Sequence, residues 1–163
     1  MGKDIDEGRA EAIDKRSGEI YDELNTDPRP IAGARPLLAA LASSSLPWAI
    51  ATSSRPEQVR ASVAALKLPR EPRIIDGGHV EHAKPAPDLL LLAAEKLKVA
   101  PARCWYVGDS TWDMLAARAA GMVRVAVPYG VASKSDLLSS GAQVATTFRS
   151  VLGDLRRRSL VDS

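Results

Sequence analysis

From about residue 30 onward, the chain alternates between short apolar runs and longer amphipathic or Ala/Leu-rich stretches. This alternation is typical of repeated βα units around a parallel sheet. The apolar runs predict five strands, the last of them weakly: Trp48–Thr52, Arg73–Asp76, Cys104–Val107, Val123–Val127 and Gln143–Ala145. The stretches between them predict six helices: Ala34–Ala42, Arg55–Leu66, Asp88–Lys98, Trp112–Ala120, Lys134–Ser139 and Phe148–Arg158. The pattern therefore predicts an α/β fold.

The first 27 residues have a different pattern, because charged residues dominate and the apolar ones are widely spaced. A lone amphipathic helix is predicted, because four apolar residues fall near one helical face: Ile13, Ile20, Tyr21 and Leu24. Two prolines and a glycine in "TDPRPIAG" then end it. We therefore divide the chain into a helical segment, 1–27, and an α/β core, 28–163. The helix needs a surface to pack against.

Composition narrows the functional class. With 22 Lys and Arg against 20 Asp and Glu, the formal charge of +2 is too small to indicate a nucleic acid or an anionic membrane as partner. The basic run Arg156–Arg158 fits a solvated helix end. The single cysteine, Cys104, excludes an internal disulfide, and neither a signal peptide nor a membrane span is visible. We expect a soluble, cytoplasmic protein.

Two aspartates follow the predicted strand at Cys104–Val107. In "VGDSTWD", Asp109 comes at the carboxyl end of the strand, where open α/β folds bind ligands. Asp113 lies one helical turn further on, so both carboxylates can face the same point. Carboxylates without histidine or cysteine suit Mg²⁺. The alternative is structural: Asp113 as a first-turn helix acid and Asp109 as an N-cap.

Two further segments place polar groups near strand ends. In "PWAIATSS", Thr52 and Ser53 end an apolar strand just before a helix, and a helix N-terminus attracts anions such as phosphate. The simpler alternative is helix capping by Ser54. In "HAKPAPD", Lys84 precedes alternating prolines that stiffen its loop, so its ammonium could meet a phosphate at a fixed place. Taken alone, such a lysine is commonly just solvated.

The order of these segments resembles motifs II, III and IV of the haloacid dehalogenase superfamily of phosphohydrolases. The stretches around them are similar to bacterial phosphatases of the phosphoglycolate phosphatase and β-phosphoglucomutase type, from about Arg29 to Leu155. The resemblance implies a Rossmann-like core, with residues 1–27 as the remnant of a helical cap. It also implies Mg²⁺-dependent hydrolysis of a small phosphorylated metabolite through an aspartyl-phosphate.

The same resemblance assigns roles to individual residues. Thr52 would bind the transferring phosphoryl group, with Ser53 beside it, and Lys84 would hold that group and the nucleophile together. For the metal site, Asp109 would ligate Mg²⁺ and Asp113 would support that ligand.

Motif I, an apolar strand that ends in Asp-x-Asp and carries the nucleophile, has no counterpart here. Asp4 and Asp6 have its spacing, but only three residues precede them, so a polar helix is the better interpretation. In the family, that strand lies between the strands that are here Trp48–Thr52 and Cys104–Val107. Its loss would leave both with unpaired backbone groups. We therefore expect this chain to be inactive by itself. A non-catalytic phosphate- or Mg²⁺-binding protein, or one that needs a partner segment, is the alternative, and self-association is possible.

Overall fold

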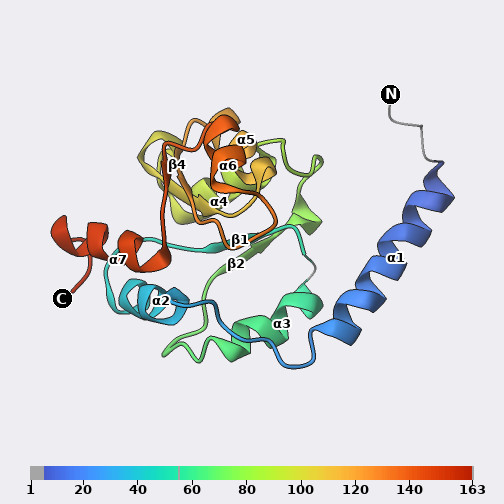
Figure 1. The fold of residues 1–163 in the computed structure, drawn as a ribbon, viewed down its shortest axis with the longest axis horizontal. Coiled ribbons are helices and arrows are strands. Elements are labelled where there is room, and N and C mark those ends of the chain that lie inside the picture. Colours follow the sequence, from blue (N-terminus) through green and yellow to red (C-terminus); the bar gives the residue numbers. More distant parts are fainter. Residues whose placement is uncertain (1–5, 55, 163) are drawn as a thin grey trace.

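A computed structural model describes residues 6–54 and 56–162 of the chain (Figure 1). In those residues the elements follow the order α1 (Glu7–Leu24), α2 (Ala34–Ser43), β1 (Ile50–Thr52), α3 (Pro56–Ala65), β2 (Ile74–Asp76), η1 (Gly77–His79), α4 (Asp88–Leu97), η2 (Pro101–Arg103), β3 (Trp105–Gly108), α5 (Thr111–Ala119), β4 (Val123–Ala126), α6 (Lys134–Ser139), β5 (Val144–Ala145) and α7 (Phe148–Arg157). The predicted α/β class is confirmed, and each predicted strand and helix is present within a few residues of its expected ends.

The strands form two parallel sheets instead of one. Strand β1 pairs with β2, and Thr52 lies opposite Asp76. Strand β3 pairs with β4, which in turn pairs with β5, so the second sheet has the order β3-β4-β5. No pairing joins β1 to β3 in the described part of the chain. In the residues that the structure describes, no strand lies between β1 and β3.

Hydrogen-bond alternation identifies the backbone groups at this interruption. The Ile50 N–H donates to the Arg73 carbonyl, so the groups of Ala51 face away from β2. The Val123 N–H donates to the Cys104 carbonyl, so the groups of Trp105 and Val107 face away from β4. Among the described residues, these outward groups have no backbone partner. Both strands are only half-buried along their whole length.

We predict that this interruption is visible in amide hydrogen exchange. The amides of Ala51, Trp105 and Val107 should exchange on the order of 10²-fold faster than those of Tyr106 and Gly108, because only the latter two face β4. Amide hydrogen exchange in the purified chain, followed by NMR, measures the exchange rates of all five amides. Equal protection at the five sites would mean that the edges are paired and would contradict the interruption.

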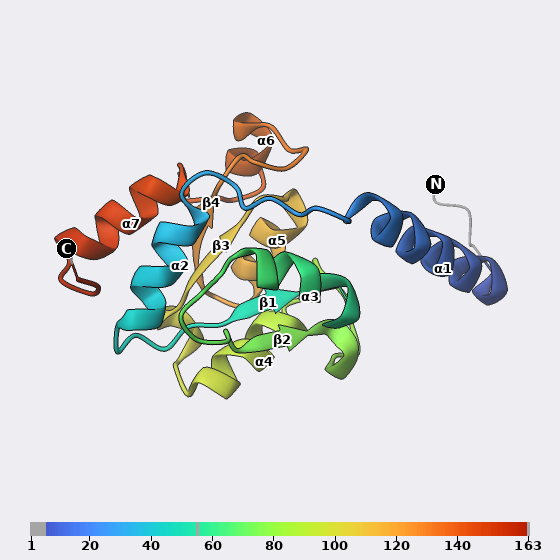
Figure 2. The ribbon, with the colours of Figure 1, turned by 90° about the horizontal axis from the view of Figure 1, so that it is seen from below.

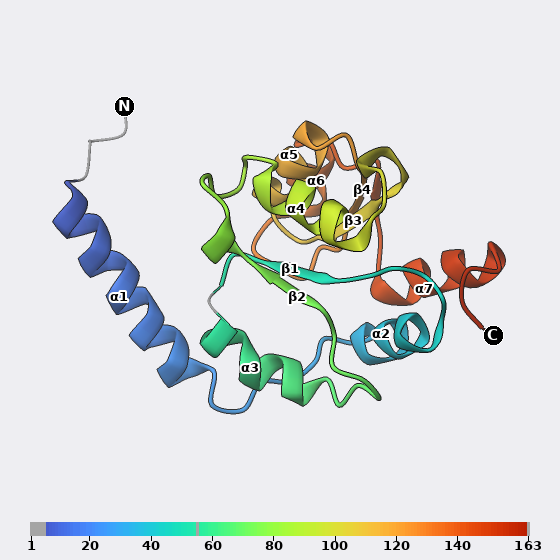
Figure 3. The same ribbon diagram turned by 180° about the vertical axis from the view of Figure 1, so that it is seen from behind.

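Helices cover the strands on both faces (Figures 1 and 3). On one face, α4 and α5 bury leucine and alanine side chains against Ile75 and the half-buried Ala51 and Tyr106. On the other face, α2 and α7 lie side by side over the second sheet, and bury Leu37, Val151, Leu152 and Leu155 around Val125. Both sheets therefore belong to one helix-covered body although their strands do not join.

Helix α1 extends away from this body as a separate arm (Figures 1 and 2). The Asp6 carboxylate caps its start by accepting from the Arg9 N–H at 2.9 Å, while Asp4 lies outside the described residues. Past its end, the Asn25 amide donates to the Ser62 hydroxyl of α3. Its apolar side chains remain exposed, and Leu24 is 79% accessible. The predicted amphipathic helix is present, and no described helix is both long and apolar enough to cross a membrane.

Candidate functional site

A buried carboxylate, Asp113, organises the carboxyl end of β3. Its Oδ2 accepts from the backbone N–H groups of Asp109 and Ser110, at 3.2 and 3.1 Å, and from the Ser110 hydroxyl at 2.8 Å. The Ser110 hydroxyl accepts from the Asp113 N–H in return, which completes a capping box at the start of α5. Ser110, rather than Asp109, is thus the N-cap of this helix.

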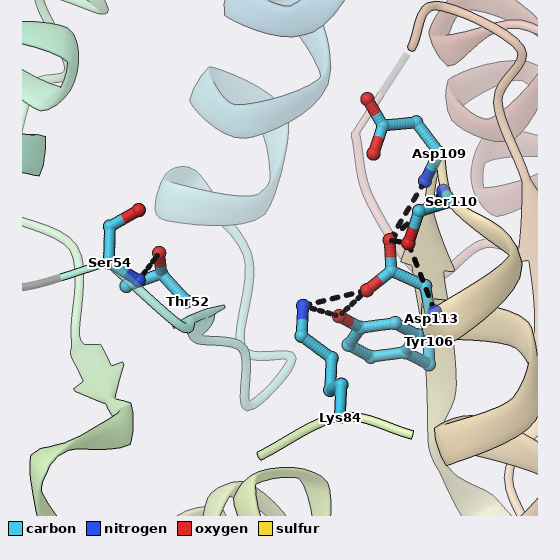
Figure 4. A network of polar contacts seen from close by, with 7 residues as sticks. All are labelled: Thr52, Ser54, Lys84, Tyr106, Asp109, Ser110 and Asp113. Carbon is cyan, nitrogen blue, oxygen red and sulfur yellow. Dashed lines mark hydrogen bonds and ion pairs between the residues drawn. The ribbon is translucent and has the colours of Figure 1, made fainter. Parts of the chain in front are cut away.

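The second oxygen of Asp113 holds a lysine. Its Oδ1 accepts from the Lys84 ammonium at 2.7 Å and from the Tyr106 hydroxyl at 2.9 Å (Figure 4). The Lys84 side chain is 18% exposed and that of Asp113 only 7%. Burial by itself raises the pKa of the Asp113 carboxyl, but Lys84, Ser110 and Tyr106 together outweigh burial and hold that pKa below its ordinary value. The Asp113 carboxyl is therefore ionised at neutral pH.

The loop that carries Lys84 is closed by a local clamp. The His82 N–H donates to the Asp88 carboxylate at 3.2 Å, and the His82 ring nitrogen Nδ1 lies 3.1 Å from the same oxygen. These contacts lower the pKa of the Asp88 carboxyl, with the His82 side-chain hydrogen bond as the largest cause. The clamp joins the start of the loop to the first residue of α4, so Lys84 lies on a short, tethered segment.

Asp109 is the residue best suited to a cation. It follows the last residue of β3, and none of the described residues donates a hydrogen bond to its side chain. The backbone of Gly130 approaches closely: a Cβ at that position would lie 2.8 Å from Asp109 Oδ2. Free carboxylate oxygens are the donors that Mg²⁺ prefers. The described residues contain no group of three or more His, Cys, Asp or Glu side chains that could hold a metal ion.

Thr52 and Ser53 lie at the end of the other sheet. The Thr52 hydroxyl accepts from the Ser54 N–H at 3.1 Å, and Ser53 is exposed. Figure 4 shows Thr52 on one side and Lys84 with Asp113 on the other, with no direct bond between the two groups. The fold thus joins Lys84, Asp109 and Asp113 into one cluster and leaves Thr52 and Ser53 in a second.

Sequence reasoning missed three residues at the first cluster: Tyr106, Ser110 and Gly130. Tyr106 resembled an ordinary core residue because it lies in an apolar strand, but a buried tyrosine needs a partner for its hydroxyl, and that requirement was the available signal. Gly130 gave no signal, because its role is to leave room for a carboxylate that is distant in sequence.

Comparison with known proteins identifies the same kind of protein as the motifs do. Residues 2–121 match the family model of the haloacid dehalogenase-like hydrolases. The chain is 38% identical to phosphoglycolate phosphatase of Escherichia coli (strain K12) over 94 residues. This match covers 57% of the chain but only 37% of the E. coli protein. The chain therefore spans well under two thirds of that relative.

Solved structures resemble the fold over more of its length. A hydrolase from Pseudomonas syringae superimposes with a TM-score of 0.86 and 31% identity, covering 99% of this chain and 76% of that protein. A HAD family hydrolase from Deinococcus radiodurans R1, solved with bound phosphate and sodium, superimposes with a TM-score of 0.72 and 27% identity. The match covers 82% of this chain and 62% of that protein. The Rossmann-like core that the motifs implied is confirmed by these likenesses.

Proposed function

This chain belongs to the haloacid dehalogenase-like hydrolases, and from that premise we propose that it carries part of an active site that hydrolyses a small phosphomonoester. The observation that carries the proposal is the Lys84–Asp113 pair beside Asp109 at the carboxyl end of β3. A fixed ammonium next to a free carboxylate is suited to a phosphate and its metal ion. The phosphate and the sodium bound by the Deinococcus radiodurans hydrolase support this choice.

Each residue has a proposed task. Lys84 has three N–H groups and two polar contacts among the described residues, so at least one N–H is available for a phosphoryl oxygen. Thr52 and Ser53 would hold the same group from the opposite side. Asp109 would hold Mg²⁺, which when bound neutralises negative charge on the phosphate. Asp113 would act as a brace, because both its oxygens are already occupied by donors.

The nucleophile would come from outside the described residues. The outward backbone groups of Ala51 on β1, and of Trp105 and Val107 on β3, have no backbone partner in the described part of the chain, and they are suited to a parallel strand lying between them. An aspartate at the carboxyl end of that strand would lie between Thr52 and Lys84. Its carboxylate would attack phosphorus and release the alcohol, and water would then hydrolyse the aspartyl-phosphate. Without that strand, we expect the chain to bind a phosphomonoester but not to hydrolyse it.

The substrate class is a small phosphorylated metabolite. The name of the E. coli relative makes phosphoglycolate one candidate among such compounds. Residues 1–27 would belong to a helical cap, which accounts for an arm that has little contact with the body. The exposed Trp112, 56% accessible, lies on α5 between the two aspartates and would border the substrate.

A chimera tests the proposal. The part of the Pseudomonas syringae hydrolase that lies outside the structural match is joined to this chain, and hydrolysis of 4-nitrophenyl phosphate is measured with and without Mg²⁺. We expect Mg²⁺-dependent turnover by the chimera and none by the chain alone. In the chimera, Asp109→Asn should lower the rate by about 10²-fold or more.

Asp162→Asn, at an exposed position near the C-terminus, is the matched control and should leave the rate unchanged. A folded chimera without phosphatase activity would refute the proposed function. Turnover by the chain alone that Asp109→Asn abolishes would confirm a hydrolase but refute the requirement for a further strand.

A further inference from the structure

Tyr106 connects the hydrophobic core to the charged cluster. Its ring packs against buried residues of α4 and α5, and also against Met114, Ala126 and Leu137. Its hydroxyl donates to Asp113 Oδ1 at 2.9 Å, and the Lys84 ammonium lies 3.5 Å from the same hydroxyl. The three polar groups therefore form a closed triangle (Figure 4).

The members of this triangle differ in stiffness. Lysine carries its charge on a flexible four-carbon stem, whereas tyrosine has only two side-chain torsions, which a packed core fixes. Asp113 is already held by the Ser110 capping box through its other oxygen. Tyr106 and Asp113 together thus present two fixed oxygens to one flexible ammonium.

We propose that Tyr106 is a positioning residue, whose hydroxyl and Asp113 Oδ1 together hold the Lys84 ammonium in place before any phosphate is present. The inference rests on the proposed function only for the identity of the group that Lys84 meets. The hydroxyl acts as a donor to Asp113 and as an acceptor for Lys84, and phenylalanine can do neither. Since phenylalanine keeps the ring, Tyr106→Phe separates positioning from packing.

The experiment follows the Lys84 ammonium by ¹H–¹⁵N NMR in the purified chain, without substrate, under mildly acidic conditions. In the wild type, its protons should exchange with water at least about tenfold more slowly than those of the exposed Lys15. In the Tyr106→Phe protein, the Lys84 protons should exchange about tenfold faster than in the wild type, because one hydrogen bond commonly supplies protection of that size. Tyr129→Phe, which removes a hydroxyl from an exposed ring, is the control and should change nothing.

An unchanged Lys84 signal in a folded Tyr106→Phe protein would overturn the inference. If the Tyr106→Phe protein does not fold, an NMR measurement on the wild type tests the inference instead. The Tyr106 hydroxyl proton should then be observable in slow exchange, with a nuclear Overhauser effect to the Lys84 side chain, and its absence would equally overturn the inference. Because no turnover is measured, failure here is distinct from failure of the chimera.

Discussion

Replacing Lys84 by methionine is expected to lower the free energy of unfolding by about 3–5 kcal/mol at pH 7, because Asp113 is then a buried charge without a cation. The wild-type carboxyl has a lowered pKa, so its stabilising contribution is complete above the unfolded value of about 3.9 and is lost as the pH falls through the folded value. In the variant, burial without the lysine raises the pKa of Asp113. The difference between the two proteins should therefore shrink as the solution is acidified.

Urea unfolding at neutral and at acidic pH measures this effect. Lys15→Met, on an exposed face of α1, is the matched control and should stay within about 0.5 kcal/mol of the wild type. Adding Asp113→Asn to Lys84→Met should recover part of the loss at pH 7, because the uncompensated charge is gone. A loss below about 1 kcal/mol for Lys84→Met would show that the pair is solvated rather than buried.

Gly108→Ala should cause the next largest loss in the free energy of unfolding. A Cβ at this position would lie 2.6 Å from Asp113 Cβ and 2.8 Å from Asp113 Oδ2, closer than atoms approach in packed proteins. Forcing an extra methyl group into a packed site costs about 1–3 kcal/mol. We expect the upper end of that range, because the atoms that must move belong to the hydrogen-bonded Asp113 cluster. Thermal and urea unfolding measure the loss.

The control for Gly108→Ala is Gly153→Ala in α7. There, the added Cβ would meet only the end of the Arg157 side chain, at 3.4 Å, and alanine favours the helix by about 0.5–1 kcal/mol. The two glycine substitutions should thus have opposite signs. Equal effects would argue that Asp113 can move away from β3 without loss.

The elements were predictable because apolar periodicity separates strands from helices. The N-cap of α5 was not: Asp109 was the candidate, and Ser110 is the residue that caps the helix. The spacing of Asp109 and Asp113 predicted that both carboxylates can face the same point, and that stays a prediction; the contact that the structure shows between them runs from the Asp109 N–H to Asp113 Oδ2. The spacing did not reveal what each carboxylate binds: Asp113 holds Lys84 from 29 residues away, and nothing in a helical repeat encodes that contact. Tyr106 was missed for the same reason, since alternation along a strand identifies a buried face but not a hydrogen bond at its edge.

The division of the sheet was predictable only through family resemblance. Composition and periodicity predict the individual strands, but they do not give strand order, and β1 and β3 would pass as neighbours in an ordinary parallel sheet. For α1, the sequence predicted an amphipathic helix that needs a surface to pack against, and its apolar side chains are exposed in the structure. The assignment of α1 to a helical cap stays a prediction.

If the proposed function holds, the interruption between β1 and β3 bears on substrate choice. Thr52 lies at the end of one sheet and Asp109 just past the end of the other, and within residues 6–54 and 56–162 no ladder hydrogen bond joins the two sheets. The intervening strand of the proposed function would add two spacings of about 4.8 Å, and bulkier or smaller side chains on it would tilt the two sheets apart or together. The width of the site would then be tuned by residues that never touch the substrate, so selection could adjust it without altering the chemical groups.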